Sequence, residues 1–377
     1  MKIKRVKLKI LYFTNIFPHY RIPIWKELLN STKFSIEIFY SKSKFNQIKD
    51  AEVKDKRFHE NKSNLKHLKN YKFFGHIFWQ SKSLIKSIFS DYDVIFLLGD
   101  MKIISNWIVP LVVRLRNKKV VYWTHGIYGN ESAIKKAIRV IFLNLATDIL
   151  LYENRAKKIL VQHGFDTMKL HVVYNSLDYN NQKIIFKKLM INSKSIKNRI
   201  VFIGRLTKVK KIEMLVNAII NLSFQKKNFE LVIIGDGPEK PYLERIVNLS
   251  ICKKNIKFMG SLYDETKIAK VIFNSDLCVS PGNIGLSCIH SLTYGTPVCT
   301  HKNFNNQMPE AEAIKSGENG IFFKENDIID LQETILRWFE NHHNKNSRQL
   351  IRKIVDEKYN PKYQMKVINN MIDKWQK

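Results

Sequence analysis

Short apolar runs alternate with segments of helical spacing along the first half of the chain. The first run, residues 7–14, is largely apolar and ends in polar residues, as does a buried parallel strand followed by a loop. Residues 22–29 place apolar side chains at helical spacing, and residues 34–39 alternate as a second strand would. Strands alternating with helices predict a doubly wound parallel sheet. Further strands are expected at 93–98, 119–123, 149–152 and 170–173.

The pattern is interrupted after Asp178 and then begins again. Residues 179–199 contain no acidic residue and no glycine but several lysines, which indicates a domain boundary. The sequence therefore predicts an α/β fold of two doubly wound, Rossmann-like domains, 1–190 and 199–355, facing each other across a cleft at the carboxyl ends of their sheets. The elements expected after the boundary are strands at 199–203, 230–234, 256–259, 277–280 and 297–300, and helices at 212–222, 240–249, 267–274, 285–294, 330–341 and 361–375.

Composition changes this picture in one respect, the charge. Hydrophobic residues make up 45% and charged residues 26% of the 377 residues, as in globular proteins. However, 64 Lys and Arg residues stand against 33 Asp and Glu residues, a formal charge of +31. Such an excess favours an anionic partner, which can be nucleic acid, an acidic membrane leaflet or a phosphorylated substrate. Alternatively, part of the excess is compositional drift on solvated faces.

Cysteine usage and the apolar runs bear on the compartment. The four cysteines lack C-x-x-C spacing, which indicates buried thiols in a reducing environment. The apolar run at 10–13 ends too early for a signal peptide, and no stretch of about 18 apolar residues is present to span a bilayer. We therefore expect a cytoplasmic protein.

Two cations follow the strand expected at 199–203. Gly204 and Arg205 come directly after this strand, and Lys210 lies on the loop that enters the next helix. Two cations beside a helix N-terminus can flank a diphosphate and stabilise it as a leaving group without a metal. The alternative is that Arg205 and Lys210 are two of many solvated cations.

Two glycine-containing loops follow later strands of the second half. Gly235-Asp-Gly-Pro-Glu239 is by itself only turn chemistry. The segment 280–297 has glycines that follow a strand and open a helix, so its backbone N–H groups can meet an anion. His290 lies about one turn further along that helix. A lone helical histidine of this kind is more often a satisfied core or surface residue than a ligand.

In this order and spacing, these motifs resemble the donor domain of retaining glycosyltransferases of family 4, the glycosyl transferases group 1, which have the GT-B fold. The motifs that carry the resemblance are Gly-Arg-Leu with Lys210, Gly-Asp-Gly-Pro-Glu, and Pro-x3-Gly-Leu followed by Gly-x-Pro-Val. Pro309-Glu310 and Gly317-x-Asn-Gly320 fit the family's downstream signature, and Asn175-Ser-Leu-Asp178 resembles the end of its acceptor domain. The resemblance implies that a C-terminal helix, 356–377, packs towards the first domain.

The resemblance also implies roles for individual residues of the second domain. Gly204, Arg205 and Lys210 would bind the diphosphate of the sugar nucleotide. The family usually has two glutamates eight positions apart, the first on the donor sugar and the second on the ribose. Gly282 and His290 occupy these positions here, so the donor's outer hydroxyls must be held differently. The donor nucleoside and sugar site would comprise Gly282, Asn283, Ile284, Gly285, Leu286 and His290, with Phe258 and Gly260 near the base.

In the first domain, the resemblance points to the loops after the strands. Family members often carry a histidine after the strand at 119–123, and His125 in Thr-His-Gly126 fits that catalytic position near the transferred sugar. The loop after the first strand contains His19 and Arg21, which would contact an acceptor phosphate or the diphosphate. The alternative for His125 is a loop histidine without a role.

The resemblance further implies a reaction without a metal or another cofactor. Retaining transfer would need only the nucleoside-diphosphate sugar as co-substrate, with positioning and charge stabilisation from the enzyme. The spacing Asp91-Tyr-Asp93 is that of a D-x-D metal motif, but it lies at the start of a strand, which indicates surface residues.

The excess of positive charge also bears on the partner of the protein. Residues 61–90 contain six lysines and no acid among aromatic residues, and 131–146 place Ile134, Ile138, Ile141 and Leu145 at helical spacing beside cations. Such segments suit peripheral contact with an anionic leaflet. We therefore expect a location on the inner face of the membrane and a glycan or lipid-linked acceptor, as in lipopolysaccharide, capsule or exopolysaccharide assembly. The alternative is that these apolar faces lie in the core.

Three other classes of function compete with this interpretation. A nucleic-acid-binding protein would explain the charge, but no helix-turn-helix, zinc or RNA-binding signature is present and the charge is spread along the chain, so no nucleic acid is expected. A GT-B protein that binds a sugar nucleotide without transferring it would explain the missing glutamates. A related sugar-nucleotide epimerase is disfavoured by the spacing of Arg205 and Lys210.

Overall fold

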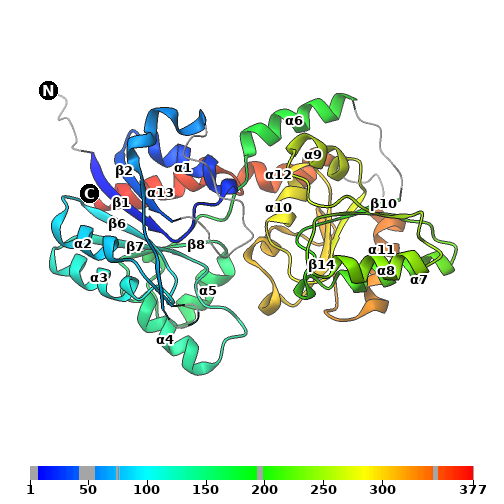
Figure 1. Cartoon of the computed structure of the whole chain (residues 1–377), viewed down its shortest axis with the longest axis horizontal. Coiled ribbons are helices and arrows are strands. Elements are labelled where there is room, and N and C mark those ends of the chain that lie inside the picture. The colour runs from blue at the N-terminus through cyan, green and yellow to red at the C-terminus, as the bar shows by residue number, and fades with distance from the viewer. Residues whose placement is uncertain are drawn as a thin grey trace. The chain divides into compact units, whose positions relative to one another are not determined.

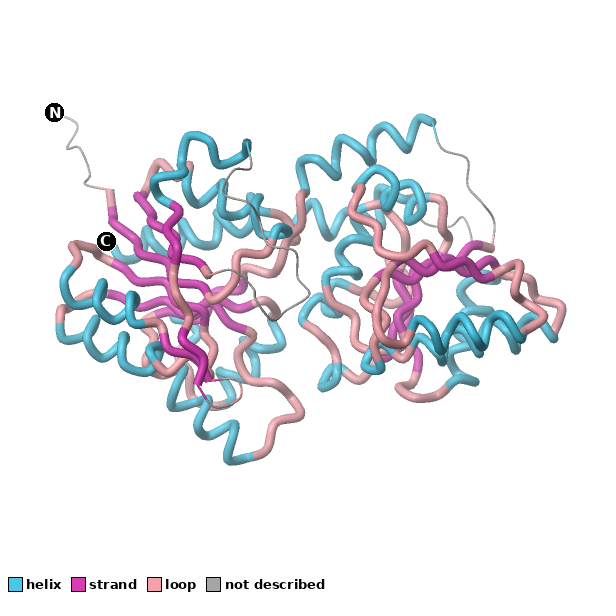
Figure 2. Tube along the Cα trace, viewed as in Figure 1, coloured by secondary structure: helices cyan, strands magenta, loops and turns pink. Residues whose placement is uncertain are grey.

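The computed structural model describes residues 7–41, 56–73, 75, 77–192, 198–342 and 347–376. The chain divides into two compact units, Met1–Asp178 with Pro361–Lys377 and Tyr179–Asn360. Each unit has a parallel β-sheet with helices on its faces (Figure 1 and Figure 2). The predicted pair of Rossmann-like α/β domains is therefore confirmed.

The sheet of the first unit has seven parallel strands in the order β3-β2-β1-β6-β7-β8-β9. The chain moves outward from β1 to β3 and then resumes at β6, so the strand order reverses between β1 and β6, where such sheets form a crevice. A short antiparallel pair, β4 and β5, lies outside this sheet, and the sequence did not predict it or β3. The strands are β1 (Leu8–Thr14), β2 (Phe34–Tyr40), β3 (Leu65–His67), β4 (Tyr71–Phe73), β5 (Ile77–Trp79), β6 (Val94–Leu98), β7 (Lys119–Thr124), β8 (Asp148–Leu151) and β9 (Leu170–Val172).

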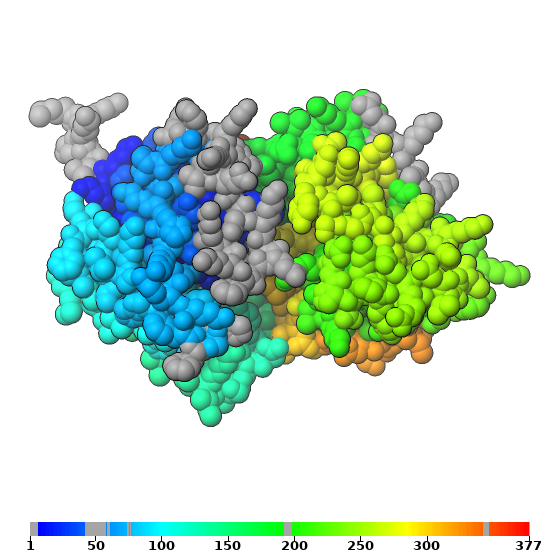
Figure 3. All heavy atoms as spheres, in the orientation of Figure 1, coloured from blue at the N-terminus to red at the C-terminus, as the bar shows by residue number. Residues whose placement is uncertain are grey.

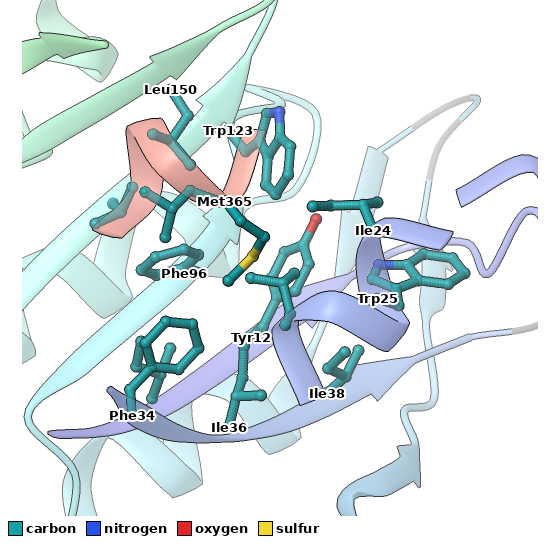
Figure 4. Close-up of a cluster of buried hydrophobic side chains, with 14 of the residues drawn as sticks. Tyr12, Ile24, Trp25, Phe34, Ile36, Ile38, Phe96, Trp123, Leu150 and Met365 are labelled. Carbon is teal, nitrogen blue, oxygen red and sulfur yellow. The ribbon is translucent and has the colours of Figure 1, made fainter. Parts of the chain in front are cut away.

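Helices cover both faces of this sheet. Because alternate residues of each strand point to opposite faces, each strand contributes apolar side chains to the core on both sides. Within β1, Ile10 and Tyr12 belong to one apolar cluster and Leu11 and Phe13 to the other. Figure 4 shows part of the first cluster, in which Tyr12 and Trp123 lie among aliphatic and other aromatic side chains. The helices of this part are α1 (Ile22–Leu29), α2 (Ser81–Phe89), α3 (Ser105–Leu115), α4 (Ala133–Leu143) and α5 (Asn154–Gln162).

The C-terminal helix α13 (Pro361–Trp375) belongs to the first unit, far from the rest of that unit in sequence. It packs beside α1 and contributes four apolar residues to the core cluster that contains Tyr12. Gln364 fixes it further, because its side chain donates to the Tyr174 carbonyl (3.0 Å) and accepts from the Ser176 hydroxyl (2.6 Å). The expected return of the C-terminal helix is therefore observed. The four core residues are Met365, Ile368, Met371 and Ile372.

The sheet of the second unit has six parallel strands in the order β12-β11-β10-β13-β14-β15. Its strand order reverses between β10 and β13, by the same rule. The strands are β10 (Arg199–Ile203), β11 (Glu230–Ile234), β12 (Ile256–Phe258), β13 (Leu277–Ser280), β14 (Val298–His301) and β15 (Gly320–Phe323). The helices are α6 (Tyr179–Asn192), α7 (Ile212–Phe224), α8 (Lys240–Leu249), α9 (Glu265–Phe273), α10 (Leu286–Thr293), α11 (Ile328–His342) and α12 (Arg348–Glu357).

The division of the chain differs from the sequence interpretation at both ends of the second unit. The structure places Tyr179–Asn192 there as helix α6, which packs on α9 and α10, whereas the sequence assigned residues up to 190 to the first domain. The C-terminal segment that belongs to the first unit begins at Pro361, whereas the sequence interpretation began it at residue 356. Among the described residues, no helix is long and apolar enough to cross a bilayer.

Candidate functional site

The loops after β10 and β11 are pressed together at the carboxyl edge of the second sheet. Gly204 N–H donates to the Ile234 carbonyl (3.0 Å), and Leu206 N–H donates to the Asp236 carbonyl (2.9 Å). A Cβ at Gly235 would lie 1.8 Å from the Gly204 carbonyl oxygen, so no side chain fits there. The glycines therefore bring the chain after Gly204 into a fixed path that carries Arg205 and Lys210 to the sheet edge.

The loop after β13 approaches the same segment, through Gly282. The Gly282 N–H donates to the Lys210 carbonyl (3.0 Å), and a Cβ at position 282 would lie 2.0 Å from the carbonyl oxygen of Val209. Position 282, where the resembling family has a glutamate, is therefore one at which this chain accommodates no side chain. The carboxylate is missing, but the close approach of the two loops places Asn283 within hydrogen-bond distance of Lys210.

Lys210 is the best-defined cation of this edge. Its Nζ donates to the backbone carbonyl (2.7 Å) and to the side-chain oxygen (2.9 Å) of Asn283. Burial of the ammonium lowers the pKa of Lys210 to about 8, while the Glu310 charge acts to raise it and the Arg205 charge to lower it. Arg205 itself is exposed, and its side chain has no hydrogen bond or ion pair with any residue that the structure describes. The two predicted diphosphate-binding cations thus lie close enough to repel each other.

The N-terminus of α10 lies on the same loop. Gly285 is the N-cap, and buried Ile284 before it donates its N–H to the Gln307 side chain (2.8 Å), which in turn donates to the Thr300 hydroxyl (2.9 Å). The first N–H groups of a helix have no partner within it and carry a partial positive charge. Residues 282–286 therefore form a rigid turn whose helix end can add to the charge of Lys210.

Glu310 is a buried acid that the sequence did not assign to the site. It lies on the 3-10 turn Pro309–Ala313 and is almost fully buried. A Cβ placed on Gly285 would be 3.9 Å from the Glu310 carboxylate oxygen Oε2. The negative charge of Glu310 acts to raise the pKa of Lys210. The only sequence signal for it is the Pro309-Glu310 pair, which matched the family signature without indicating its position.

His290 is bound by an acidic residue from another helix. Its Nε2 lies 2.9 Å from Glu265 Oε1, which also accepts hydrogen bonds from the Tyr294 hydroxyl (2.5 Å) and from the Gln182 side chain (3.0 Å). Burial opposes ionisation of Glu265, but His290 and these hydrogen bonds together lower its pKa to about 2. The sequence missed Glu265, since it lies at the start of α9 and nothing in its local pattern indicates the pairing.

Phe258 and Gly260 lie at the end of β12 and in the loop after it. Phe258 ends β12 and packs partly against the core of the second unit. Gly260 follows with φ +64° and accepts a hydrogen bond from the Gly235 N–H (2.8 Å), so the loop after β12 is tied to the loop after β11. The next exposed apolar side chains on this loop are Met259 and Tyr263.

In the first unit, a cavity of about 400 Å³ lies at the carboxyl ends of four strands, and His125 and Arg21 line it. His125 follows β7, with its ring beside those of Tyr152 and Tyr128. Burial, together with the charges of Arg21 and Arg139, lowers the pKa of His125 to about 4, so the ring is neutral near pH 7. Its Nδ1 is buried without a hydrogen-bond partner in the described structure.

Arg21 is held in this cavity by aromatic rings. Its guanidinium lies 5.2 Å from the ring centre of Trp123 and 5.4 Å from that of Tyr152, and it donates to the Tyr12 hydroxyl (3.4 Å). Stacking on aromatic faces fixes the plane of an arginine and leaves its other donors available. His19, predicted together with Arg21, is exposed two residues earlier and does not line the cavity.

The predicted residues therefore fall into two groups, each within one unit. The second unit brings together Arg205, Lys210 and residues 282–286, with His290 on the next helical turn. The first unit brings together His125 and Arg21. In the described parts of the chain, no three His, Cys, Asp or Glu side chains are grouped closely enough to hold a metal ion.

Comparison with known proteins agrees with this geometry. Residues 181–355 match the family described as Glycosyl transferases group 1. This part of the chain is similar to the group 1 glycosyltransferases. A glycosyltransferase of Methanocaldococcus jannaschii, itself uncharacterized, is 22% identical over 308 residues, which cover 75% of this chain and 76% of the relative.

Solved structures extend the likeness to both units. The lipopolysaccharide outer core galactosyltransferase WaaB superimposes with a TM-score of 0.69 at 16% identity, covering 97% of this chain and 99% of that one. Anabaena HepE, solved in complex with UDP and glucose, gives a TM-score of 0.65 at 15% identity, covering 97% and 99%. At these identities the likeness shows the fold, which is GT-B, with two Rossmann-like domains in one chain.

Proposed function

We propose that the chain is a retaining glycosyltransferase that moves a sugar from a nucleoside-diphosphate sugar to a glycan or lipid-linked acceptor. The observation that carries the proposal is the desolvated Lys210 ammonium beside Arg205 and the N-terminus of α10. A buried cation without an adjacent carboxylate hydrogen bond attracts an anion strongly, since low local dielectric strengthens the interaction. We take this anion to be a diphosphate, in keeping with the family that residues 181–355 match.

The chemistry asked of these residues is charge stabilisation. The acceptor oxygen forms a bond to the anomeric carbon on the face from which the diphosphate leaves, and the bond from that carbon to the phosphate oxygen breaks. A phosphate oxygen of the departing diphosphate takes the acceptor's proton. Arg205, Lys210 and the α10 N–H groups stabilise the charge that develops on the diphosphate, so the proposal includes no metal.

His125 is proposed to orient the reacting sugar or the acceptor hydroxyl. With a pKa of about 4, its imidazole is neutral near pH 7 and offers one hydrogen-bond donor and one acceptor. A neutral ring is suited to positioning hydroxyl groups rather than to supplying charge. The donor sugar's remaining contacts fall to the residues around Gly282 and to Glu310.

The pathway proposed is the assembly of a surface polysaccharide at the inner face of the membrane. The sequence left open whether the isoleucines of α4 lie in the core, and the structure leaves Ile134 76%, Ile138 45% and Ile141 63% exposed. Exposed apolar residues beside lysines on one helix support contact with an anionic leaflet. Sedimentation with vesicles of anionic and of neutral phospholipid at low salt tests this: equal failure to bind both would remove the membrane contact.

The activity is tested with a panel of sugar nucleotides and a mixture of glycan and lipid-linked acceptors. Acceptor-dependent nucleotide release, with an anomeric proton coupling in the product that matches the donor's configuration, is the expected result, and excess EDTA should leave the rate unchanged. A thermal shift with UDP, GDP, ADP or CMP but no turnover would favour the alternative, a binding protein without transferase activity. No response to any of the four nucleotides would refute the assignment.

A further inference from the structure

The cavity of the first unit contains an arginine without a counter-ion. Among the residues that the structure describes, Arg21 has no ion-pair partner, and its nearest groups are the rings of Trp123 and Tyr152 and the hydroxyl of Tyr12. Arg21 is partly buried, and a partly buried cation with no carboxylate beside it favours binding of an anion from solution. Buried Nδ1 of His125, on the same cavity wall, also has no partner.

Helix α4 supplies further positive charge to this cavity. Lys135 and Arg139, one turn apart, both line it. Glu131, outside the lining, holds Arg139 through two hydrogen bonds of 2.8 and 2.5 Å and lies 3.4 Å from the Lys135 ammonium. The lining as a whole contains four cations and one acid, Asp100, so the cavity carries a net positive charge.

The other face of α4 is apolar and exposed. Ile134, Ile138 and Ile141 recur every three or four residues on the face opposite the buried Leu143, whereas Lys136 is half-buried on another side of the helix. Figure 3 shows this segment, in teal, projecting at the lower margin of the first unit. Helix α4 therefore presents cations to the cavity on one side and exposed apolar side chains on another.

We propose that this cavity binds the phosphate group of an acceptor whose hydrocarbon chain stays in the membrane against the isoleucines of α4. The inference rests on the proposed function and narrows its acceptor to a phosphate ester of a long-chain lipid. Arg21 and Lys135 contact the phosphate oxygens, and the aromatic walls receive the groups next to the phosphate. In this proposal α4 contacts both the phosphate, through Lys135, and the bilayer surface, through its isoleucines.

Binding of three probes to the full chain separates the parts of this proposal: farnesyl phosphate below its micelle concentration, farnesol, and inorganic phosphate. We expect farnesyl phosphate to bind at least about tenfold more tightly than either of the others, since only it satisfies both surfaces. Lys135→Gln should weaken farnesyl phosphate binding several-fold, and Lys136→Gln, whose lysine is half-buried on the same helix but does not line the cavity, should not.

A second pair of variants tests the apolar face. The double substitution Ile138→Ser and Ile141→Ser should weaken farnesyl phosphate without changing inorganic phosphate binding. Leu249→Ser, which replaces a residue 85% exposed in the second unit, is the matched control and should change neither. These side chains are exposed, so the fold is retained in all these variants, and far-ultraviolet circular dichroism checks this.

Arg21→Gln decides between the acceptor and the donor as the source of the phosphate. It should reduce farnesyl phosphate binding at least about tenfold and leave UDP binding within about twofold. Equal losses for UDP and farnesyl phosphate, equal binding of farnesol and farnesyl phosphate, or equal effects of the two lysine substitutions would each overturn the inference. UDP binding that persists while farnesyl phosphate fails leaves the proposed function intact, whereas failure of UDP itself removes that function.

Discussion

Replacing Lys210 by glutamine should weaken binding of the donor's diphosphate and remove its pH dependence. Two of the three N–H groups of the ammonium are used on Asn283, which leaves one for a phosphate oxygen. A hydrogen bond between charged groups contributes about 1.5–3 kcal/mol, which corresponds to roughly a 10- to 150-fold rise in Kd. Glutamine keeps most of the side-chain length and can still donate to Asn283, so the change isolates the charge.

The pH dependence follows from the sign of the pKa shift. Burial lowers the pKa of Lys210 to about 8, so the free protein loses this proton as the pH rises through 8, and an anion that binds the charged form must recover it. Wild-type affinity for UDP should therefore be constant below about pH 7 and fall by up to about tenfold per pH unit above pH 8. The same shift acts oppositely on folding: it favours the folded state increasingly as the pH rises from 8 to the ordinary lysine value of 10.5.

Isothermal titration of UDP at constant ionic strength, between about pH 7 and pH 9.5, measures both effects. The Lys210→Gln protein serves as the internal control, because any titration of UDP itself is common to both proteins. Lys208→Gln, which replaces an exposed lysine on the same 3-10 turn, should bind UDP as the wild type does. A wild-type profile parallel to that of Lys210→Gln, or an equal loss in Lys208→Gln, would refute the reasoning.

Three further predictions concern single residues of the two sites. Gly282→Glu, which restores the carboxylate of the resembling family, should destabilise the second unit by about 1–3 kcal/mol in urea unfolding and not raise activity, because its Cβ would lie 2.0 Å from the Val209 carbonyl; a stable, more active variant would show that the loop moves freely. His290→Ala should raise the apparent donor constant at least about tenfold, as expected if His290 and Glu265 hold the ribose, and an unchanged constant removes His290 from the site. Because the pKa of His125 is about 4, the pH–rate profiles of the wild type and of His125→Asn should have the same shape between pH 5.5 and 7.5. An inflection in this range that is present in the wild type and lost in His125→Asn would mean that the ring titrates in its ordinary range.

Much of the fold was accessible from the sequence because buried parallel strands read as short apolar runs. The first strand, for example, was expected at 7–14 and is Leu8–Thr14. Helix α6 was missed because its buried residues, Tyr179, Gln182 and Phe186, form a narrow stripe in a lysine-rich segment whose other apolar residues are half-buried or exposed. Such a helix is stabilised by packing on α9 and α10, which periodicity alone does not register.

The candidate site divides in the same way. Arg205 and Lys210 could be found because a glycine-cation pattern after a strand has a recognisable spacing. Glu265 and Glu310 could not, because each reaches its partner only through the tertiary structure: Glu265 meets His290 across two helices, and Glu310 approaches Gly285 from a later turn. The absence of a side chain at position 282 was visible in the sequence, but its reason, contact with the Val209–Lys210 backbone, required the structure.

The place of α13 also sets an order of events during synthesis. Residues 179–360 form one continuous unit, whose core is complete once that segment has left the ribosome. The first unit, although translated earlier, lacks Met365, Ile368, Met371 and Ile372 until α13 emerges, and until then the side of its sheet around Tyr12 and Trp25 is incompletely covered. The domain made first is therefore the one finished last, and during that interval it is the part of the nascent chain that most needs a chaperone.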